Sequence, residues 1–354
     1  MTYRVIQWAT GQIGTNAVAG IVSHPDLDLV GAWVHSAGKE GRDVGTLCGL
    51  KPLGVHATRD KDAVLAIPAD CVCYAVGRSW MEHGKEALIA ELGRILRSGK
   101  NVVNATWPSL VNPKGIDDAI YDELQAACLE GGSSFYTAGI DPGFGSVGLA
   151  VAALTVSSNV RSVHMYEILN YAAWDAPQMI TFFGFGQKRL GMVSTPGYLA
   201  GIFRSTLCLV AEAMGVRLDD IVEEIDVIHA DEALDLPSVN VAPGTISGVR
   251  FQVKGMVEGE ARVVVDHVTK LRNQDFPEIP FNGGGYRAEV SGEPCVRLDM
   301  ELSSAGRDNA HAALAASAMS LVNAIPRVCE APPGVLTYLD LIPHPARVQS
   351  KKTG

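Results

Sequence analysis

The stretch VIQWATGQIG, residues 5–14, decides the fold of this chain. An apolar run over 3–8 ends in a short turn with Gly11 and Gly14, and a helical pattern over 15–23 follows. In such a unit the first glycine lets the backbone approach a pyrophosphate, and the second lets the helix pack close to the strand. The N–H groups of the helix start then face the anion. A glycine pair alone also occurs in ordinary turns, but its place between a strand and a helix predicts a bound dinucleotide.

Short apolar runs and helical patterns alternate through the first third of the chain. We expect strands at 3–8, 27–34, 69–76, 102–106 and 134–138, and helices at 15–23, 83–98 and 116–130. This rhythm is typical of a doubly wound parallel sheet. The sequence therefore predicts an α/β fold with a Rossmann dinucleotide-binding domain over residues 1–140.

The pattern changes near residue 140. We expect a strand at 160–171, a helix at 195–214, a hairpin of 249–257 and 261–271 around Glu258-Gly259, and a strand at 295–302. A helix at 308–324 should be closed by Pro326, and the tail after it should be loop-rich. Residues 141–305 thus form a predicted α+β domain with a mostly antiparallel sheet, for substrate binding and dimerisation.

Composition excludes several classes of function. The formal net charge of −10 argues against nucleic-acid binding, which needs a basic surface, and the basic pair Lys351-Lys352 is too short to supply one. We see no signal peptide and no unbroken membrane span, and therefore expect a cytoplasmic protein without membrane partners. None of the seven cysteines forms a CxxC pair, so we expect buried thiols and no metal site.

The end of the second strand bears on the choice of cofactor. NAD enzymes usually place an acid there for the ribose 2′-hydroxyl, and VHSAGKEGR (34–42) has none directly after the strand. Ser36, Lys39 and Arg42 could instead hold a 2′-phosphate, which favours NADP, with NAD possible. A solvated loop is the structural alternative. Further cofactor contacts are expected from Thr10, Gly11, Gln12, Ile13, Gly14, Ala75, Gly77, Asn104, Thr106 and Asp141.

A polar loop, NATWPSLVNP (104–113), follows the strand at 102–106. Because Pro108 cannot continue a central strand, we expect the strand to end at Thr106. Open α/β sheets bind ligands at such strand ends. The expected substrate wall is apolar, although aromatic clusters are more often plain core, and its members are Trp107, Ser109, Phe144 and Tyr171.

Four stretches resemble the dihydrodipicolinate reductase-like oxidoreductases, in the branch of 2,4-diaminopentanoate dehydrogenase and native amine dehydrogenases. They are VIQWATGQIG (5–14), SAGKEGRDVG (36–45), AGIDPGFG (138–145) and LVNAIPRVCEAPPGVLT (321–337). The resemblance implies hydride transfer between a nicotinamide and a C=N or C=O carbon. It also implies a homodimer formed by the second domain, and a C-terminal helix that returns residues 306–354 to the first domain.

Two positions depart from that branch. Relatives carry carboxylates in a form like T-C-E-E-L-x-x-P, where this chain has Pro108 and Ser109, and they tend to have N-P-G-F where it has Asp141-Pro142-Gly143-Phe144. Reductive amination needs a group that accepts a proton from ammonia or water and then stabilises an iminium. A carboxylate does both, whereas serine and proline do neither at neutral pH.

A carboxylate could still come from elsewhere in the chain. The catalytic candidates are Glu167, Asp141 and Asn170, with His267 and His311 as further acids. All but Asn170 have a structural alternative: Asp141 a turn aspartate, Glu167 one half of an ion pair, and the histidines ordinary core or surface residues.

The sequence thus predicts an NAD(P)H-dependent oxidoreductase that acts on a small hydrophobic carbonyl compound, imine or amine. The alternative is a non-catalytic NADP-binding sensor or scaffold that lost the carboxylates of the family. Reduction of dihydrodipicolinate itself is not expected, because the second domain shows no Lys/His cluster for a dicarboxylate.

Overall fold

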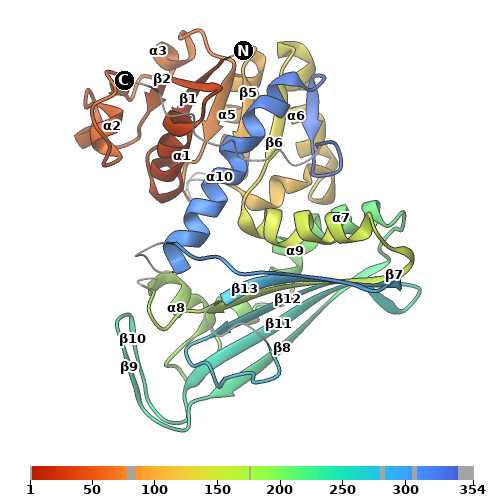
Figure 1. Cartoon of the computed structure of the whole chain (residues 1–354). Helices are drawn as coiled ribbons and strands as arrows, with labels where there is room; N and C mark the ends of the chain where they lie inside the picture. The colour runs from red at the N-terminus through yellow and green to blue at the C-terminus, as the bar shows by residue number, and fades with distance from the viewer. Residues whose placement is uncertain (1, 78–83, 175–176, 280–283, 305–308, 342–354) are drawn as a thin grey trace. The chain divides into compact units, whose positions relative to one another are not determined.

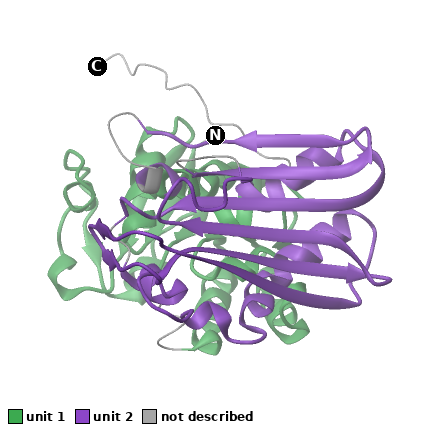
Figure 2. Cartoon of the chain, turned by 90° about the horizontal axis from the view of Figure 1, so that it is seen from below, with its two compact units in different colours: residues 1–143, 314–354 green, residues 144–313 purple. Residues whose placement is uncertain are grey.

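The computed structural model describes residues 2–77, 84–174, 177–279, 284–304 and 309–341. The expected helix starts at 83 and 308 and the pair Lys351-Lys352 lie outside these residues. The chain divides into two compact units, which Figure 2 shows in different colours. Unit 1 comprises residues 1–143 and 314–354, and unit 2 comprises residues 144–313.

Unit 1 is built on a seven-stranded sheet in the order β15-β6-β5-β4-β1-β2-β3, and every pair in it is parallel. The strands are β1 Tyr3–Trp8, β2 Leu27–Trp33, β3 Ala57–Thr58, β4 Cys71–Tyr74, β5 Asn101–Asn104, β6 Ser134–Thr137 and β15 Gly334–Leu336. The strand order reverses between β1 and β4, the place where doubly wound sheets open a crevice for ligands. The predicted Rossmann fold is confirmed.

The helices of this unit (Figure 1) are α1 Gln12–Ser23, α2 Val44–Leu47, α3 Lys61–Leu65, α5 Lys85–Arg97, α6 Asp118–Gly131 and most of α10 Asn309–Glu330, with short 3-10 turns η1 Ala37–Lys39, η2 Pro108–Val111 and η3 Pro113–Gly115. Buried side chains of α5, α6 and the strands form its core. The Asp117 side chain accepts from the N–H of Ala119 at the start of α6, and Gly132, with φ 62°, ends the helix.

Three expectations for unit 1 were wrong. Strand β5 ends at Asn104, two residues early, because Asn104 Oδ1 accepts from the Thr106 N–H and turns the chain out of the sheet. Helix α10 continues through Pro326, since the burial of Leu321, Ile325 and Val328 offsets the lost hydrogen bond. The tail adds strand β15 beside β6, where a loop was expected.

Segment His311–Glu330 of α10 is long and apolar enough to cross a membrane by those two criteria alone. Its buried residues include Leu321 and Val322, and Met319 and Val322 lie against Gly20 of α1. The helix is therefore partly buried, over 44% of its most apolar window.

Unit 2 contains a six-stranded sheet in the order β14-β13-β7-β12-β11-β8, antiparallel except for the β7–β12 pair. The strands are β7 Ser158–Asn170, β8 Asp220–His229, β11 Ile246–Val257, β12 Glu260–Lys270, β13 Gly284–Glu293 and β14 Val296–Met300. A separate hairpin joins β9 Leu234–Leu236 and β10 Val239–Val241. Positive φ at Glu258 and Gly259 makes the predicted turn between β11 and β12.

Helices α7 Leu149–Leu154 and α9 Tyr198–Ala213 pack on this sheet, and α8 Pro177–Phe183 follows β7. A π-type segment, η4 Ile140–Gly148, leads into α7, and η5 Met192–Ser194 precedes α9. Burial of the thiols is incomplete: Cys71, Cys73 and Cys128 are buried, but Cys295 is exposed, since it lies just before the short strand β14.

Candidate functional site

The glycine turn after β1 has two glycines with different surroundings. A Cβ on Gly14 would lie 2.2 Å from the Ala9 carbonyl oxygen, a backbone atom that the Gln7 side chain also binds at 2.8 Å. A Cβ on Gly11 would meet no atom within 4 Å. The fold therefore requires glycine at position 14, whereas the space beside Gly11 is open at the start of α1, where backbone N–H groups lack helical partners.

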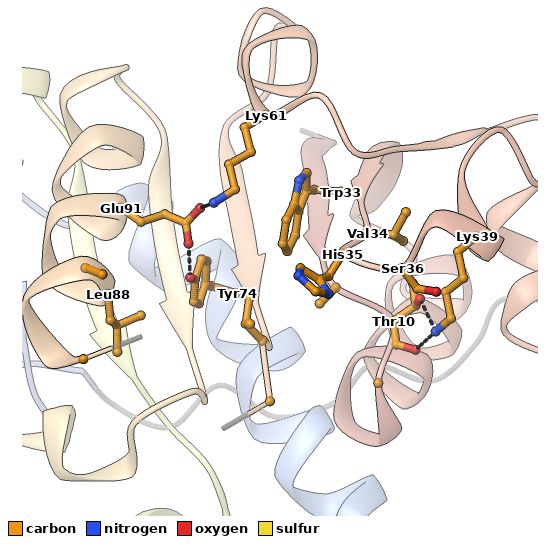
Figure 3. A pocket seen from close by; sticks show the side chains of 16 residues that line it. Thr10, Trp33, Val34, His35, Ser36, Lys39, Lys61, Tyr74, Leu88 and Glu91 are labelled. Atoms are coloured by element: carbon orange, nitrogen blue, oxygen red, sulfur yellow. Dashed lines mark hydrogen bonds and ion pairs between the residues drawn. The ribbon is translucent and has the colours of Figure 1, made fainter. Parts of the chain in front are cut away.

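A cavity of about 620 Å³ opens beside this turn. It is walled by the ends of β2 and β4, the turn after β1, and helices α3 and α5 (Figure 3). Of the predicted cofactor residues, Thr10, Gly11, Ser36, Lys39 and Gly77 line it. A large cavity at the switch point of the sheet, with an open Gly11, fits a dinucleotide.

Lys39 is held at the glycine turn by neutral oxygens. Its Nζ donates to the Thr10 carbonyl at 2.8 Å and to Thr10 Oγ1 at 3.0 Å (Figure 3). Among the ion pairs of the described residues, Lys39 has no carboxylate within 4.0 Å. Its charge is thus available to an anionic ligand.

A second polar group lies on the other side of the cavity in Figure 3. The Tyr74 hydroxyl donates to Glu91 Oε2 at 2.6 Å, and Lys61 forms an ion pair with the same carboxylate. Burial and the neighbouring Glu91 carboxylate raise the pKa of Tyr74 far above its usual value, so this hydroxyl stays protonated. Lys61 Nζ also lies 4.9 Å from the ring centre of Trp33, in cation–π range.

Sequence reasoning missed this second group. Glu91 lies on α5 between Leu88, Leu92 and Ile95, all of which are buried. An acid on the apolar stripe of an amphipathic helix was the available signal, because such a position is usually apolar.

The other predicted cofactor residues do not line this cavity. Asn104 is fully buried, and its Nδ2 donates to Thr137 Oγ1 at 3.0 Å. Thr106 is buried, and its Oγ1 makes no hydrogen bond within the described part of the chain. Arg42 is exposed, and Ala75 is buried beside β4. The remaining members of the set are Gln12, Ile13 and Gly14 in the first turn of α1, and Asp141 in η4.

Unit 2 pairs Glu167 with a histidine. Glu167 on β7 faces His267 on β12, and their side chains are in direct contact. His267 Nδ1 lies 3.1 Å from Thr269 Oγ1, and its ring stacks on Phe251 with centroids 4.7 Å apart. The side chains of Glu167 and His267 are 12% and 9% exposed, so the pair is largely shielded from water. A carboxylate beside an imidazole can hold a proton and pass it on.

Aromatic side chains pack around the histidine of this pair, as Phe183 and Phe203 also contact the His267 ring. The predicted wall residue Tyr171 is buried and packs on Trp174 at 4.7 Å. Asn170 donates to Asn273 Oδ1 at 2.7 Å at the end of β7.

The remaining candidates lie in different surroundings. Trp107 and Ser109 are buried in unit 1, and Trp107 belongs to its core. Phe144 is 37% exposed in unit 2, and His311 lies in the first turn of α10.

Comparison with known proteins identifies the family. A model of the 2,4-diaminopentanoate dehydrogenase C-terminal domain matches residues 183–353. A 4-hydroxy-tetrahydrodipicolinate reductase of Synechococcus elongatus is 38% identical over 63 residues, 18% of this chain and 23% of that one. An amine dehydrogenase of Streptomyces virginiae is 33% identical over 350 residues, which cover 96% of each chain. This chain belongs to the dihydrodipicolinate reductase-like amine dehydrogenase family.

Solved structures support the same fold. An amine dehydrogenase from Mycobacterium smegmatis superposes with a TM-score of 0.73 at 20% identity and covers 98% of both chains. A probable dehydrogenase from Thermotoga maritima gives a TM-score of 0.59 at 12% identity, over 95% of this chain and 92% of that one. The family relationship makes the chain an NAD(P)-dependent oxidoreductase, and the alternative of a non-catalytic protein is set aside.

Proposed function

We propose that this family member transfers hydride between NADP(H) and the C=N or C=O carbon of a small hydrophobic substrate, as an amine dehydrogenase or an imine or ketone reductase. The observation that carries the proposal is the dinucleotide-sized cavity beside the open Gly11, in a chain with a full-length match to an amine dehydrogenase. The nicotinamide supplies the hydride chemistry when bound. The protein supplies binding, orientation and proton transfer.

The preference for NADP rests on Ser36 and Lys39. Both line the cavity, and Lys39 is held by neutral oxygens, so a 2′-phosphate would be its first anionic partner among the contacts described. A hydrogen bond to a charged group contributes about 1.5–3 kcal/mol, which corresponds to roughly 10- to 150-fold in affinity.

Fluorescence titration with NADPH and NADH tests this preference. We expect Lys39→Met to weaken NADPH binding at least tenfold (about 1.4 kcal/mol) and to leave NADH binding nearly unchanged. Lys51→Met, at an exposed lysine of the same unit, is the control. Equal losses for both cofactors would remove the case for NADP, and a wild-type chain that binds neither would refute the proposed function.

The proton-transfer role falls to the Glu167–His267 pair of unit 2. Pro108 and Ser109 stand where the family resemblance expects carboxylates, and Ser109 is buried. Glu167 is a shielded carboxylate beside an imidazole that packs on aromatic rings, and His267 and Thr269 extend a chain of proton-holding groups behind it. The aromatic surroundings favour a hydrophobic substrate.

NADPH oxidation with a panel of cyclic and aryl ketones, with and without ammonia, tests the reaction. General acid–base groups contribute roughly 100- to 10,000-fold to rate, so we expect Glu167→Gln to lower kcat by at least about 100-fold while NADPH still binds. The control is Glu260→Gln, at an exposed residue of β12. Full activity of Glu167→Gln would move the proton-transfer role to another residue.

We also propose that the protein is a homodimer, as the family resemblance implies, and that it works in the cytoplasm. Light scattering on the purified protein should give twice the monomer mass of 37.6 kDa. A monomer at micromolar concentration would contradict this.

A further inference from the structure

The carboxylate of Glu91 is unexpected in a pocket for a polyanionic cofactor. It is the only acid among the sixteen described residues that line the cavity, and 19% of its side chain is exposed. A carboxylate repels phosphate groups. Glu91 must therefore either contribute to binding another part of the ligand or serve only to stabilise the fold.

The neighbours of Glu91 reduce the electrostatic cost. Lys61 balances its charge, and the Tyr74 hydroxyl occupies one position on Oε2. A carboxylate offers about four acceptor positions, so these two contacts leave capacity for a donor on a ligand. Because Tyr74 and Lys61 hold it from two sides, the carboxylate is fixed in orientation.

The rest of the cavity indicates which part of a dinucleotide comes near Glu91. Thr10, Ser36 and Lys39 lie on the opposite side in Figure 3, where we place the phosphates. On the Glu91 side the lining includes Leu88, which lies on the same helix, and Trp33, whose ring centre lies 4.9 Å from Lys61 Nζ. A flat, weakly polar ring suits such walls. The adenine base has that character, and it is attached to the ribose that carries the 2′-phosphate.

We propose that Glu91 accepts a hydrogen bond from the exocyclic amino group of adenine, and that Tyr74 and Lys61 act as positioning residues for this carboxylate. The inference rests on the proposed function, because it assigns the base end of the same NADP pocket. It makes Glu91 a specificity residue that selects adenine over bases with an oxygen at that position.

The test compares reduced NADPH with its hypoxanthine analogue, in which a carbonyl oxygen replaces the amino group. The readout is the dissociation constant from nicotinamide fluorescence, so no turnover is needed. We expect the wild-type protein to bind NADPH roughly 10- to 100-fold more tightly, since the analogue turns an acceptor toward the carboxylate and leaves it without a donor.

Two substitutions sharpen the test. Glu91→Leu should bind both ligands with similar affinity, because it removes the acceptor. Glu91→Gln should narrow the preference at least tenfold or reverse it, since its amide N–H can donate to the hypoxanthine oxygen (about 1.4 kcal/mol per tenfold). The control is Glu86→Gln, at an exposed acid of the same helix, which should keep the wild-type preference.

The outcomes separate the two proposals. Equal wild-type affinity for NADPH and its analogue would overturn the role of Glu91 even if neither variant folded. The role would also be overturned if the Glu91 variants changed the ratio of NADPH affinity to NADH affinity but kept the wild-type preference for NADPH over its hypoxanthine analogue. Glu91 would then contact the ribose and not the base. If the wild-type protein bound no dinucleotide, the proposed function itself would fail.

Discussion

At the scale of single residues, Gly11 and Gly14 serve different purposes although they lie three positions apart. A Cβ at position 14 would lie 2.2 Å from a backbone carbonyl oxygen, whereas a Cβ at position 11 would meet no atom of the described residues within 4 Å. Ala9 has a positive φ of 72°, an uncommon conformation for a residue with a Cβ, and its carbonyl oxygen is bound by the Gln7 side chain. The turn is therefore shaped by internal contacts, and the space beside Gly11 stays open.

The two glycines should respond differently to alanine. Gly11→Ala should unfold like the wild type but bind NADPH at least tenfold more weakly (about 1.4 kcal/mol), because the methyl group occupies the space of the ligand. Gly14→Ala should lower the free energy of unfolding by about 1–3 kcal/mol through overpacking. Urea unfolding and fluorescence titration of both variants check this, and a stable Gly14→Ala protein would contradict the geometry.

The glycine turn could be predicted from the sequence because the spacing of its glycines follows from local backbone requirements of the strand–turn–helix unit. The Glu91 group could not, since its members come from β4, α3 and α5 and meet only when the sheet forms. The pairing of Glu167 with His267 had the same obstacle. Their contact depends on the register of two parallel strands about 100 residues apart in sequence, and the alternation within each strand does not contain that register.

At the scale of elements, helices pack closely in unit 1 where glycine permits it. A Cβ on Gly131 at the end of α6 would lie 2.0 Å from the Leu96 carbonyl oxygen of α5. A Cβ on Gly20 of α1 would instead meet the Met319 methyl group of α10 at 2.4 Å. The first obstacle is backbone, and the second is the flexible end of a side chain.

This contrast predicts unequal costs for the same substitution. Gly131→Ala should destabilise unit 1 by about 2–3 kcal/mol, because neither backbone can yield cheaply. Gly20→Ala should cost less than about 1 kcal/mol, since Met319 can change rotamer and alanine favours helix. Urea unfolding of the two variants decides the matter, and a reversed order would show that α5 and α6 shift more easily than this geometry implies.

Element type was predicted well wherever an apolar pattern was long and interrupted by turns, as in β1, α5 and the β11–β12 hairpin. The errors came where tertiary contacts overrode a local signal. Proline predicted the end of α10, but buried packing carries the helix past it. Strand β15 has only three residues, too few for a periodic pattern, and exists because β6 offers a free edge.

In unit 2, Asp266 anchors a charged group on the sheet face opposite the Glu167–His267 pair. Its side chain is fully buried and receives two hydrogen bonds from Arg250, at 2.9 and 2.7 Å, and one each from Gln252 and His164. Burial alone would raise the pKa of Asp266, but these donors outweigh it and lower that pKa to about 2. The charged form is thus favoured in the folded protein.

The buried Asp266 carboxylate makes stability depend on pH. A carboxyl whose folded pKa is about 2 and whose ordinary value is 3.8 stabilises the fold above pH 4, and this stabilisation is lost as the pH falls toward 2. Asp266→Asn should cost about 3 kcal/mol at neutral pH, the lower end for a broken buried pair, because Arg250 stays 21% exposed. The difference from wild type should shrink by about 2 kcal/mol between pH 5 and pH 2. Urea unfolding across that range checks it, and a constant difference would contradict it.

At the scale of the whole molecule, each unit has its own buried core. One is centred on Trp8, Tyr74 and Leu92 in unit 1, and the other on Ile168, Val268 and Phe276 in unit 2. The residues that line the cavity belong to unit 1 alone, whereas the Asp266 group belongs to unit 2. The cavity residues and the Asp266 group have no contact partner in common among the contacts described. The free-energy changes caused by substitutions in such separate groups usually add.

Additive free energies should appear when ligand binding and a substitution in unit 2 are combined. A ligand at 100 times its dissociation constant stabilises a protein that binds it only when folded by about 2.7 kcal/mol. We expect NADPH at that ratio to stabilise wild type and Asp266→Asn by the same increment, while Lys39→Met gains much less at the same NADPH concentration. Calorimetry of the three proteins with and without NADPH measures this. A smaller increment for Asp266→Asn would mean that the sheet of unit 2 contributes to cofactor affinity. The residues that line the cavity would then supply only part of the binding free energy.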